Sequence, residues 1–226
     1  MTHRRPTDVL AETVEVSGQD VLDVGCGEGQ LVRWLRGHGA RAVGADCGAE
    51  MLNRALQADP EHPECYVDAP GQALPFDDQS FDVVVFSNSL HHIPTADMGL
   101  ALAEAGRVLR PGGQLYVAEP EIDGPEDSVG YPVIDETEVR TAAQQALDGL
   151  DQRQFGPLRR FNYSSETVYE SFDQWCDLVV GIDPGRASAL DVHKDDLDER
   201  FHRLGERRSD GWVFTNHSLV SVATRS

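Results

Sequence analysis

The stretch Val21-Leu22-Asp23-Val24-Gly25-Cys26-Gly27-Glu28-Gly29 sets the architecture of the chain. Its apolar residues run into three alternating glycines and then into a helical pattern over Gln30–Arg36. Glycine permits positive φ and lets a ligand lie against the main chain, and a helix N-terminus presents unpaired N–H groups. The stretch therefore predicts a strand, a tight turn and a helix, with a ligand at the turn.

Two features of this turn bear on the kind of ligand. A dinucleotide fingerprint requires a third glycine three residues after the second, and that position holds Gln30. Glu28 places a carboxylate beside the helix N-terminus that a diphosphate would have to approach. A ligand without phosphate therefore fits better. The alternative is a structural glycine turn with no ligand.

Length, composition and cysteine spacing narrow the class of protein. The chain has 226 residues, 40% of them hydrophobic and 26% charged, as in a one-domain globular protein. It contains no apolar run of the ~20 residues that a membrane span needs, and no apolar core follows the basic N-terminus. Cys26, Cys47, Cys65 and Cys176 are too widely spaced for a zinc knuckle or a redox pair. We expect a cytoplasmic protein with reduced thiols and no metal site.

The charge balance bears on the partners. Nineteen basic residues against 39 acidic ones give a net charge of −20. Such a surface repels nucleic acid phosphates and anionic membranes. We therefore expect neither a nucleic acid nor a membrane partner.

An acidic residue ends the second predicted strand, Ala42–Ala45. Asp46 stands about twenty residues past the glycine turn, where an acid can accept hydrogen bonds from both hydroxyls of a ribose. The alternative role is that of an N-cap for the predicted helix Ala49–Gln57. Both readings place a carboxylate at the carboxyl edge of the sheet.

The run Phe81–Phe86 reads as a buried parallel strand that ends at Ser87 and Asn88. Open α/β sheets bind ligands along the edge where such strands end. Of the two histidines that follow, we expect His91 to be a packing residue. His92 either faces the ligand or lies in water.

Five landmarks in order carry a resemblance to a known family. They are the glycine turn, Asp46, the segment Cys65–Phe76 with its Ala-Leu-Pro-Phe tail, the Leu-His-His-Ile step, and Leu-Arg-Pro-Gly-Gly at 109–113. Over roughly residues 20–120 the chain resembles the class I S-adenosylmethionine-dependent methyltransferases of the small-molecule type. One departure concerns the adenine contact, since the family's acid position holds Pro70 and Asp68 stands two residues earlier. Either Asp68 reaches the adenine through a bulge, or Gly71 and Gln72 supply the contact.

The resemblance implies a fold, a cofactor and a set of binding residues. The implied fold is α/β, a doubly wound, mostly parallel seven-stranded sheet with an antiparallel C-terminal strand. The implied cofactor is S-adenosyl-L-methionine, with S-adenosyl-L-homocysteine as product. The implied cofactor-binding residues are Asp23, Gly25, Cys26, Gly27, Asp46, Cys47, Met51, Asp68, Gly71, Gln72, Ser87 and Asn88. His92 is the candidate for a catalytic base on the substrate side, with Tyr163 and His217 as weaker candidates.

We expect residues 1–226 to form one methyltransferase domain. Residues 1–120 are the cofactor-binding core, and 121–210 are a helical insertion with late sheet strands that covers the substrate. Residues 211–226 form the final strand or hairpin. Glu119–Asp135, rich in proline, glycine and acid, is expected to be a loop leaving the ligand edge.

The expected reaction is transfer of the sulfonium methyl group to a small-molecule nucleophile by in-line displacement. A base is needed only if the nucleophile keeps its proton. The alternatives are a protein that binds S-adenosylmethionine or S-adenosylhomocysteine without methylating and, with less support, a NAD-dependent oxidoreductase. The chain is expected to be a monomer or a homodimer.

Overall fold

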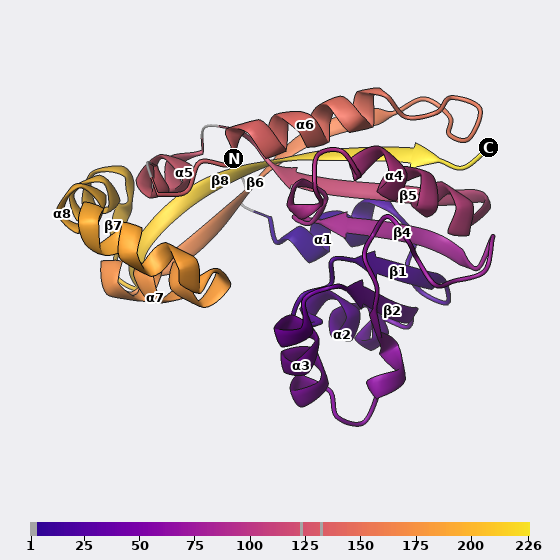
Figure 1. Cartoon of the computed structure of the whole chain (residues 1–226), viewed down its shortest axis with the longest axis horizontal. Helices are drawn as coiled ribbons and strands as arrows, with labels where there is room; N and C mark the ends of the chain where they lie inside the picture. Colours follow the sequence, from indigo (N-terminus) through magenta and orange to yellow (C-terminus); the bar gives the residue numbers. More distant parts are fainter. Residues whose placement is uncertain (1–3, 123, 132) are drawn as a thin grey trace. The chain divides into compact units, whose positions relative to one another are not determined.

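The computed structural model describes residues 4–122, 124–131 and 133–226. These residues divide into two compact units, which are described separately (Figure 1). The core unit comprises residues 5–119, 139–162 and 219–226. The appended unit comprises residues 120–138 and 163–218, together with Arg4.

One sheet carries the fold, and its strand order is β3-β2-β1-β4-β5-β8-β6. The strands are β1 (Asp20–Val24), β2 (Arg41–Asp46), β3 (Tyr66–Asp68), β4 (Phe81–Ser87), β5 (Leu109–Pro120), β6 (Arg159–Tyr169), β7 (Glu206–Arg208) and β8 (Gly211–Thr224). Strands β1 to β5 pair in parallel. Backbone bonds between Gly112, Gly113 and Arg225 join the start of β5 to the end of β8, which makes β8 antiparallel to β5. The predicted mostly parallel sheet is confirmed, and the short β7, antiparallel to β8, adds an eighth strand.

Helices connect these strands. They are α1 (Pro6–Thr13), α2 (Gln30–Gly37), α3 (Ala49–Ala58), α4 (Met98–Val108), α5 (Pro125–Gly130), α6 (Thr137–Asp148), α7 (Phe172–Ile182) and α8 (Ala187–Leu204), with 3-10 turns η1 (Pro63–Cys65), η2 (Leu90–His92) and η3 (Pro184–Arg186). The helix predicted at 30–36 is confirmed to within one residue. No helix in the described part of the chain combines the length and apolar character of a membrane span.

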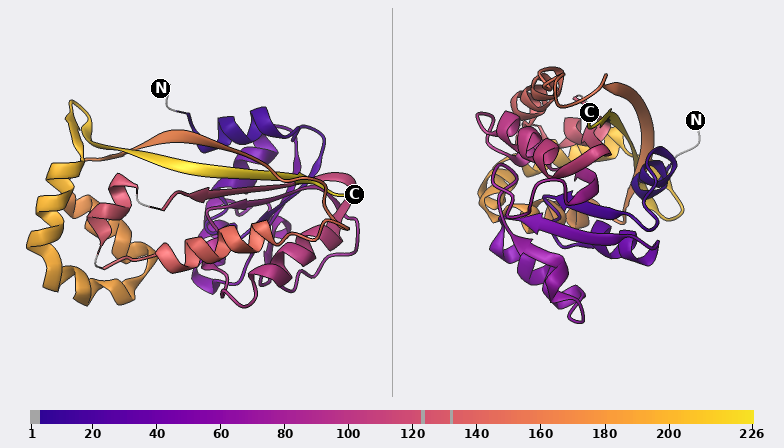
Figure 2. Two further views of the ribbon diagram at one scale, coloured as in Figure 1. Left: turned by 90° about the horizontal axis from the view of Figure 1, so that it is seen from above. Right: turned by 90° about the vertical axis from the view of Figure 1, so that its right-hand side faces the viewer.

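Alternation along the strands of the core unit divides their side chains between two faces. Leu22, Val84 and Leu115 belong to the fully buried cluster that includes side chains of α4 and α6. The right-hand view in Figure 2 shows α1 on the opposite side of the sheet from α4 and α6. The buried strands β1 and β4 are thus covered on both faces, as their uninterrupted apolar runs require.

Two predicted segments differ from the structure. The Leu-Arg-Pro-Gly-Gly landmark at 109–113, whose proline and glycines favour a turn after a helix, lies inside β5, which begins at Leu109. The turn survives as a shift in register between Phe81 and Val83 of the paired strand and as a positive φ of 82° at Gly112. In addition, Glu119–Asp135 is not a simple loop, because it contains α5, whose Val129 is fully buried.

The appended unit is held by interlocking aromatic rings. Phe201 of α8 lies 5.1 Å from Phe214 and 5.6 Å from Phe172, measured between ring centroids. The cluster also contains Val129, Tyr169, Trp175, Val179, Leu190 and Leu197. Edge-to-face and tilted ring pairs at these spacings add to the burial of apolar area. This unit therefore has an apolar core of its own.

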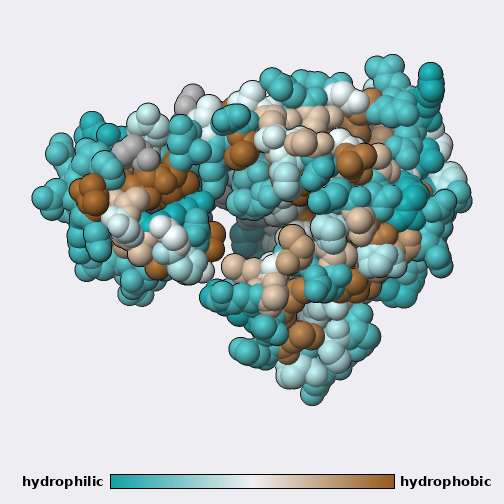
Figure 3. Space-filling model, viewed as in Figure 1, coloured by the Kyte–Doolittle hydropathy of each residue, from teal (hydrophilic) through white to brown (hydrophobic). Residues whose placement is uncertain are grey.

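The surface is mostly polar, as expected of a chain in which 26% of the residues are charged. Figure 3 shows one face of the molecule, which is mostly hydrophilic, with apolar side chains in small separate patches. Such scattered apolar groups are ordinary for a globular protein.

Candidate functional site

The three glycines that follow β1 all have positive φ, but their surroundings differ. A Cβ on Gly25 would lie 2.5 Å from Cβ of Ser89, and one on Gly29 would lie 2.4 Å from the Tyr66 ring. Around Gly27, in contrast, no atom of the described residues other than Gly27 and its two chain neighbours lies within 4 Å of that position. Gly25 and Gly29 are thus required by packing, whereas Gly27 faces open space that a ligand can use.

The carboxylate of Asp46 connects two turns at the carboxyl edge. Its Oδ2 accepts from the Gly27 amide at 2.8 Å and its Oδ1 accepts from the Gly48 amide at 2.7 Å. The N-cap of α3 is Gly48, so Asp46 is not the cap of that helix. Each carboxylate oxygen can accept a second hydrogen bond, which leaves acceptor capacity for ribose hydroxyls.

Asp23 is a buried carboxyl group on β1, with a relative exposure of 2%. Burial, together with the negative charge of Asp46, raises the pKa of Asp23 to about 7. A carboxylate in such a place becomes favourable when a cation lies beside it. The α-ammonium group of an amino-acid ligand would supply that charge.

The remaining predicted residues near the turn separate into two groups. Cys26 points into the core, because a Cβ on Gly44 would lie 2.6 Å from its sulfur, and burial raises the pKa of its thiol. Only its backbone is placed to meet a ligand. Cys47 is exposed, and Met51 is half-buried on the first turn of α3. These two side chains are accessible beside Asp46.

Asp68, the acid that stands two residues before the family's usual position, lies at the end of β3 without a β-bulge. β3 pairs with β2 in unbroken register, which sets Asp68 opposite Asp46 at the ends of the two strands. Asp68 is exposed and Gln72 is half-buried. Gly71 is buried, and a Cβ there would lie 2.9 Å from Ile93 and 3.0 Å from Val24. Gly71 is therefore constrained by packing, and Asp68 and Gln72 are the two accessible side chains.

A hydrogen-bond network that sequence reasoning missed holds the turn after β4. The Ser89 hydroxyl donates to the Val24 carbonyl at 2.5 Å, and the Leu90 amide donates to Glu119 at 2.9 Å. The second oxygen of Glu119 is bonded to Nδ1 of His91, and both side chains are buried. The packing role expected for His91 is confirmed. Because Glu119 lies 28 residues away from His91, no local signal could have shown the pair.

Ser87, Asn88 and His92 occupy the same edge as this network. Ser87 ends β4 and is half-buried, while Asn88 is exposed with a φ of 54°. His92 is exposed, and its ring centroid lies 4.0 Å from that of His91. The buried histidine thus supports the exposed one.

Glu28 has a partner that the sequence did not reveal. Arg54 of α3 donates to its carboxylate at 3.0 Å and to Glu50 at 2.6 Å. The charge of Glu28 is therefore partly balanced. The discrimination against a diphosphate consequently depends more on Gln30 at the third glycine position.

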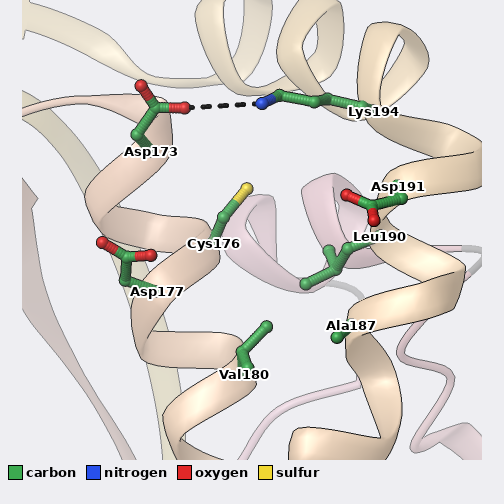
Figure 4. Close-up of a pocket in the computed structure, with 8 residues that line it drawn as sticks. All are labelled: Asp173, Cys176, Asp177, Val180, Ala187, Leu190, Asp191 and Lys194. Atoms are coloured by element: carbon green, nitrogen blue, oxygen red, sulfur yellow. Dashed lines mark ion pairs between the residues drawn. The ribbon is translucent and has the colours of Figure 1, made fainter.

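The appended unit contains a separate hollow of about 320 Å³ between α7 and α8. Figure 4 shows Asp173, Asp177 and Asp191 around an apolar floor that includes Leu190, with Lys194 paired to Asp173 at 3.8 Å. No group of three or more metal-ligating side chains is present within residues 4–122, 124–131 and 133–226. Of the weaker base candidates, Tyr163 is buried, and His217 is hydrogen-bonded to Ser164 at 3.0 Å.

Comparison with known proteins finds sequences similar to the core unit. Residues 22–117 match the family described as methyltransferase domain. The methyltransferase GfsG of Streptomyces halstedii is 36% identical over 137 residues, which are 58% of this chain and 49% of that protein. The 27-O-demethylrifamycin SV methyltransferase of Amycolatopsis mediterranei is 35% identical over 121 residues, which are 51% of this chain and 44% of that protein. The chain thus spans about half the length of these relatives.

Solved structures extend the likeness of fold to nearly the whole chain. The YcgJ protein of Bacillus subtilis superposes with a TM-score of 0.66 at 19% identity, over 96% of each chain. An S-adenosylmethionine-dependent methyltransferase from Mesorhizobium loti gives a TM-score of 0.55 at 22% identity, over 97% of this chain and 96% of that one. At these identities the superpositions establish the fold.

Proposed function

We propose that this chain methylates a small molecule, because residues 22–117 match the methyltransferase domain family and residues 20–120 resemble the class I, S-adenosylmethionine-dependent type. The reaction is in-line displacement at the sulfonium methyl group of S-adenosyl-L-methionine. The named relatives support a small-molecule acceptor, since one of them is a 27-O-demethylrifamycin SV methyltransferase.

The observation that carries the proposal is the open space at Gly27 beside the Asp46 carboxylate. The Gly27 amide is tied to Asp46, whose remaining acceptor capacity suits the ribose hydroxyls. Asp23, buried close enough to Asp46 for the two charges to interact, suits the ammonium group of the amino-acid end. Gly25 and Gly27 let the main chain approach the ligand. The residues present therefore fit a zwitterionic nucleoside ligand.

The other predicted contacts complete this assignment. We assign Met51 and Cys47 to the adenine side of Asp46, with Asp68, Gly71 and Gln72 around the base. The backbone of Cys26 and the residues Ser87 and Asn88 are assigned to the amino-acid side. The bound cofactor supplies an electrophilic methyl carbon, so the protein has to orient the acceptor and exclude water.

His92 is the candidate for a base on the substrate side. Its exposed ring at the carboxyl edge, which packs at a tilt against the ring of the hydrogen-bonded His91, supports the assignment. A base contributes only where the nucleophile keeps its proton at working pH.

Calorimetric titration with S-adenosylhomocysteine, S-adenosylmethionine and NAD tests the proposal, together with a metabolite screen using cofactor labelled in the methyl group. We expect the first two ligands to bind and label to reach a small molecule. Binding of NAD alone would contradict the proposal. Tight cofactor binding with no labelled product from a cell extract would favour the non-methylating alternative.

We further propose that residues 121–210 cover the substrate. The segment carries an exposed aromatic side chain, Tyr131, with 52% of its surface accessible. Tyr131→Ala should lower turnover and leave affinity for S-adenosylhomocysteine unchanged. Leu100→Ala, at an equally exposed apolar side chain on α4 of the core unit, is the matched control. Equal turnover in both variants would remove Tyr131 from the cover.

Location and partners are also proposals. The net charge of −20 supports a protein that does not bind nucleic acid or anionic membranes. The four cysteines, all free, are compatible with a reducing cytoplasm. We propose a cytoplasmic monomer or homodimer, which light scattering of the purified protein can distinguish.

A further inference from the structure

A cavity of about 460 Å³ lies within the core unit, on the face of the sheet covered by α1 and α2. Val85 of β4 and Tyr116 of β5 form part of its floor. The strand register sets Asp23 opposite Val85, and Val85 opposite Tyr116. The floor of the cavity therefore begins one strand away from the carboxylate that we assign to the cofactor.

The polar residues of the lining show where the cavity meets the cofactor edge. Gln30 is the first residue of α2, directly after the glycine turn, and Asn88 follows the end of β4. Leu10 and Trp34 line the cavity from the later turns of α1 and α2. A molecule lying along the cavity would thus have one end at the methyl donor and the other between the two helices.

The lining is unusual for a protein of this charge. Its walls are largely apolar or aromatic, formed by Pro6, Leu10, Leu31, Trp34, Val85 and Tyr116. None of the described lining residues carries a carboxylate or an imidazole, and the one charged member is Arg5. Arg5 is highly exposed and paired with Asp8 at 3.0 Å. Such walls favour an uncharged, flat, apolar molecule over an amine or a carboxylic acid.

The lack of a carboxylate or an imidazole in the described lining also limits the nucleophile. A phenolic hydroxyl has a pKa of about 10, and an aliphatic hydroxyl is close to water, at about 15.7. A phenol or enol therefore yields a usable fraction of oxyanion without a base, and an aliphatic alcohol does not.

We propose that this cavity is the acceptor pocket and that the acceptor is a planar, uncharged, apolar molecule methylated on a phenolic or enolic hydroxyl. The proposal rests on the proposed methyltransferase function. The hydroxyl proton passes to water, and an electron pair of the oxygen forms the new C–O bond. The bond between sulfur and the methyl carbon breaks with its pair left on sulfur, which yields a methyl ether and S-adenosylhomocysteine.

The test uses the full chain saturated with S-adenosylhomocysteine and 2-naphthol as the probe. Calorimetry should show binding of 2-naphthol, with weaker or no binding of 2-naphthoate and of cyclohexylmethanol. Leu31→Trp, which fills the cavity from α2, should weaken 2-naphthol binding by about tenfold or more. Leu100→Trp on α4 controls for an added tryptophan, and neither variant should alter affinity for S-adenosylhomocysteine.

Turnover gives a second, independent readout. With S-adenosylmethionine, kcat/KM over a series of planar phenols should rise with the acidity of the phenol. Failure of 2-naphthol to bind, or equal binding to Leu31→Trp, would overturn the proposal. Preference for the carboxylate or the alcohol would overturn the acceptor class. Failure of the wild-type protein to bind S-adenosylhomocysteine would instead overturn the underlying function.

Discussion

The core unit and the appended unit are built in different ways. The core unit buries ionisable side chains near the ends of its strands, among them Asp23, His91 and Glu119. His91 and Glu119 are hydrogen-bonded to each other. The appended unit buries mainly apolar and aromatic side chains around Phe201. We expect the buried ionisable groups of the core unit to serve ligand binding. We expect the buried aromatic rings of the appended unit to serve the stability of that unit.

The largest expected effect is at the central glycine of the core unit. Gly27→Val should abolish cofactor binding, because a branched side chain would fill the open space beside the Asp46 contact. Binding of S-adenosylhomocysteine is measured by calorimetry and folding by circular dichroism. Gly112→Val is the matched control, since Gly112 also has positive φ and open surroundings but lies at the other end of the sheet. If the Gly27→Val variant still binds S-adenosylhomocysteine, the cofactor site lies elsewhere in the chain.

The second effect concerns the appended unit alone. Phe201→Ala should destabilise that unit by about 3–5 kcal/mol, the cost of removing a buried aromatic ring. Denaturant unfolding followed by tryptophan emission reports this change, and calorimetry should show cofactor affinity retained. Leu204→Ala, at an exposed position of the same helix, is the control. Loss of cofactor binding in Phe201→Ala would show that the two units do not unfold separately.

A smaller effect is expected at the predicted ribose contact. Asp46→Ala should weaken the binding of S-adenosylhomocysteine by about 1.5–3 kcal/mol, since hydrogen bonds to a charged acceptor are lost. Asp82→Ala makes a matched control, because Asp82 also accepts from a backbone amide, that of Asp20 at 2.9 Å, but at the amino end of the sheet. Unchanged affinity in Asp46→Ala would restrict this side chain to holding its turns.

The smallest effect is the pH dependence at Asp23. With a pKa of about 7 in the free protein, Asp23 has to lose a proton before it can pair with an ammonium group. Affinity for S-adenosylhomocysteine should therefore fall as the pH drops below 7, approaching about tenfold per pH unit. Asp23→Asn should bind more weakly and without this dependence. A pH dependence retained in Asp23→Asn would assign the titration to another group.

Asp23 also makes the free energy of unfolding depend on pH, with a sign opposite to that of most carboxylates. Because its folded pKa is raised, Asp23 stabilises the fold at low pH, and that contribution is lost as the pH rises through about 7. Asp20 and Glu104 have pKa values lowered by hydrogen bonds with arginines, and their contribution is lost as the pH falls. The difference in unfolding free energy between Asp23→Asn and the wild type isolates the contribution of Asp23.

The sequence predicted the core unit well, because its signals are local. The glycine turn, the apolar run at β4 and the acid after β2 each specify an element and its end within a few residues. The two strand-end acids Asp46 and Asp68 were both identified, but their pairing was not, because it depends on strand register. The partners of Glu28 and His91 depend on contacts that only the folded chain creates.

The appended unit was less predictable for a physical reason. Helix α8 has eighteen residues of helical pattern, which is a strong signal in a single sequence. In contrast, α5 has six residues, too few for periodicity to show, and it is held by tertiary contacts. Its Glu126 accepts hydrogen bonds from Tyr169 of β6 and Asn216 of β8, and burial raises the pKa of that carboxyl. Such long-range polar contacts leave no pattern in a single sequence.

The distribution of tryptophans gives the molecule separate optical reporters. Trp34 is the one tryptophan of the core unit, where it lines the acceptor cavity and stacks on His38 at 4.0 Å between ring centroids. Trp175 and Trp212 both belong to the aromatic cluster of the appended unit. Replacing the latter two by phenylalanine would leave a chain whose fluorescence reports only on the cavity. Quenching by a bound aromatic acceptor could then be followed in real time, without a label and without turnover.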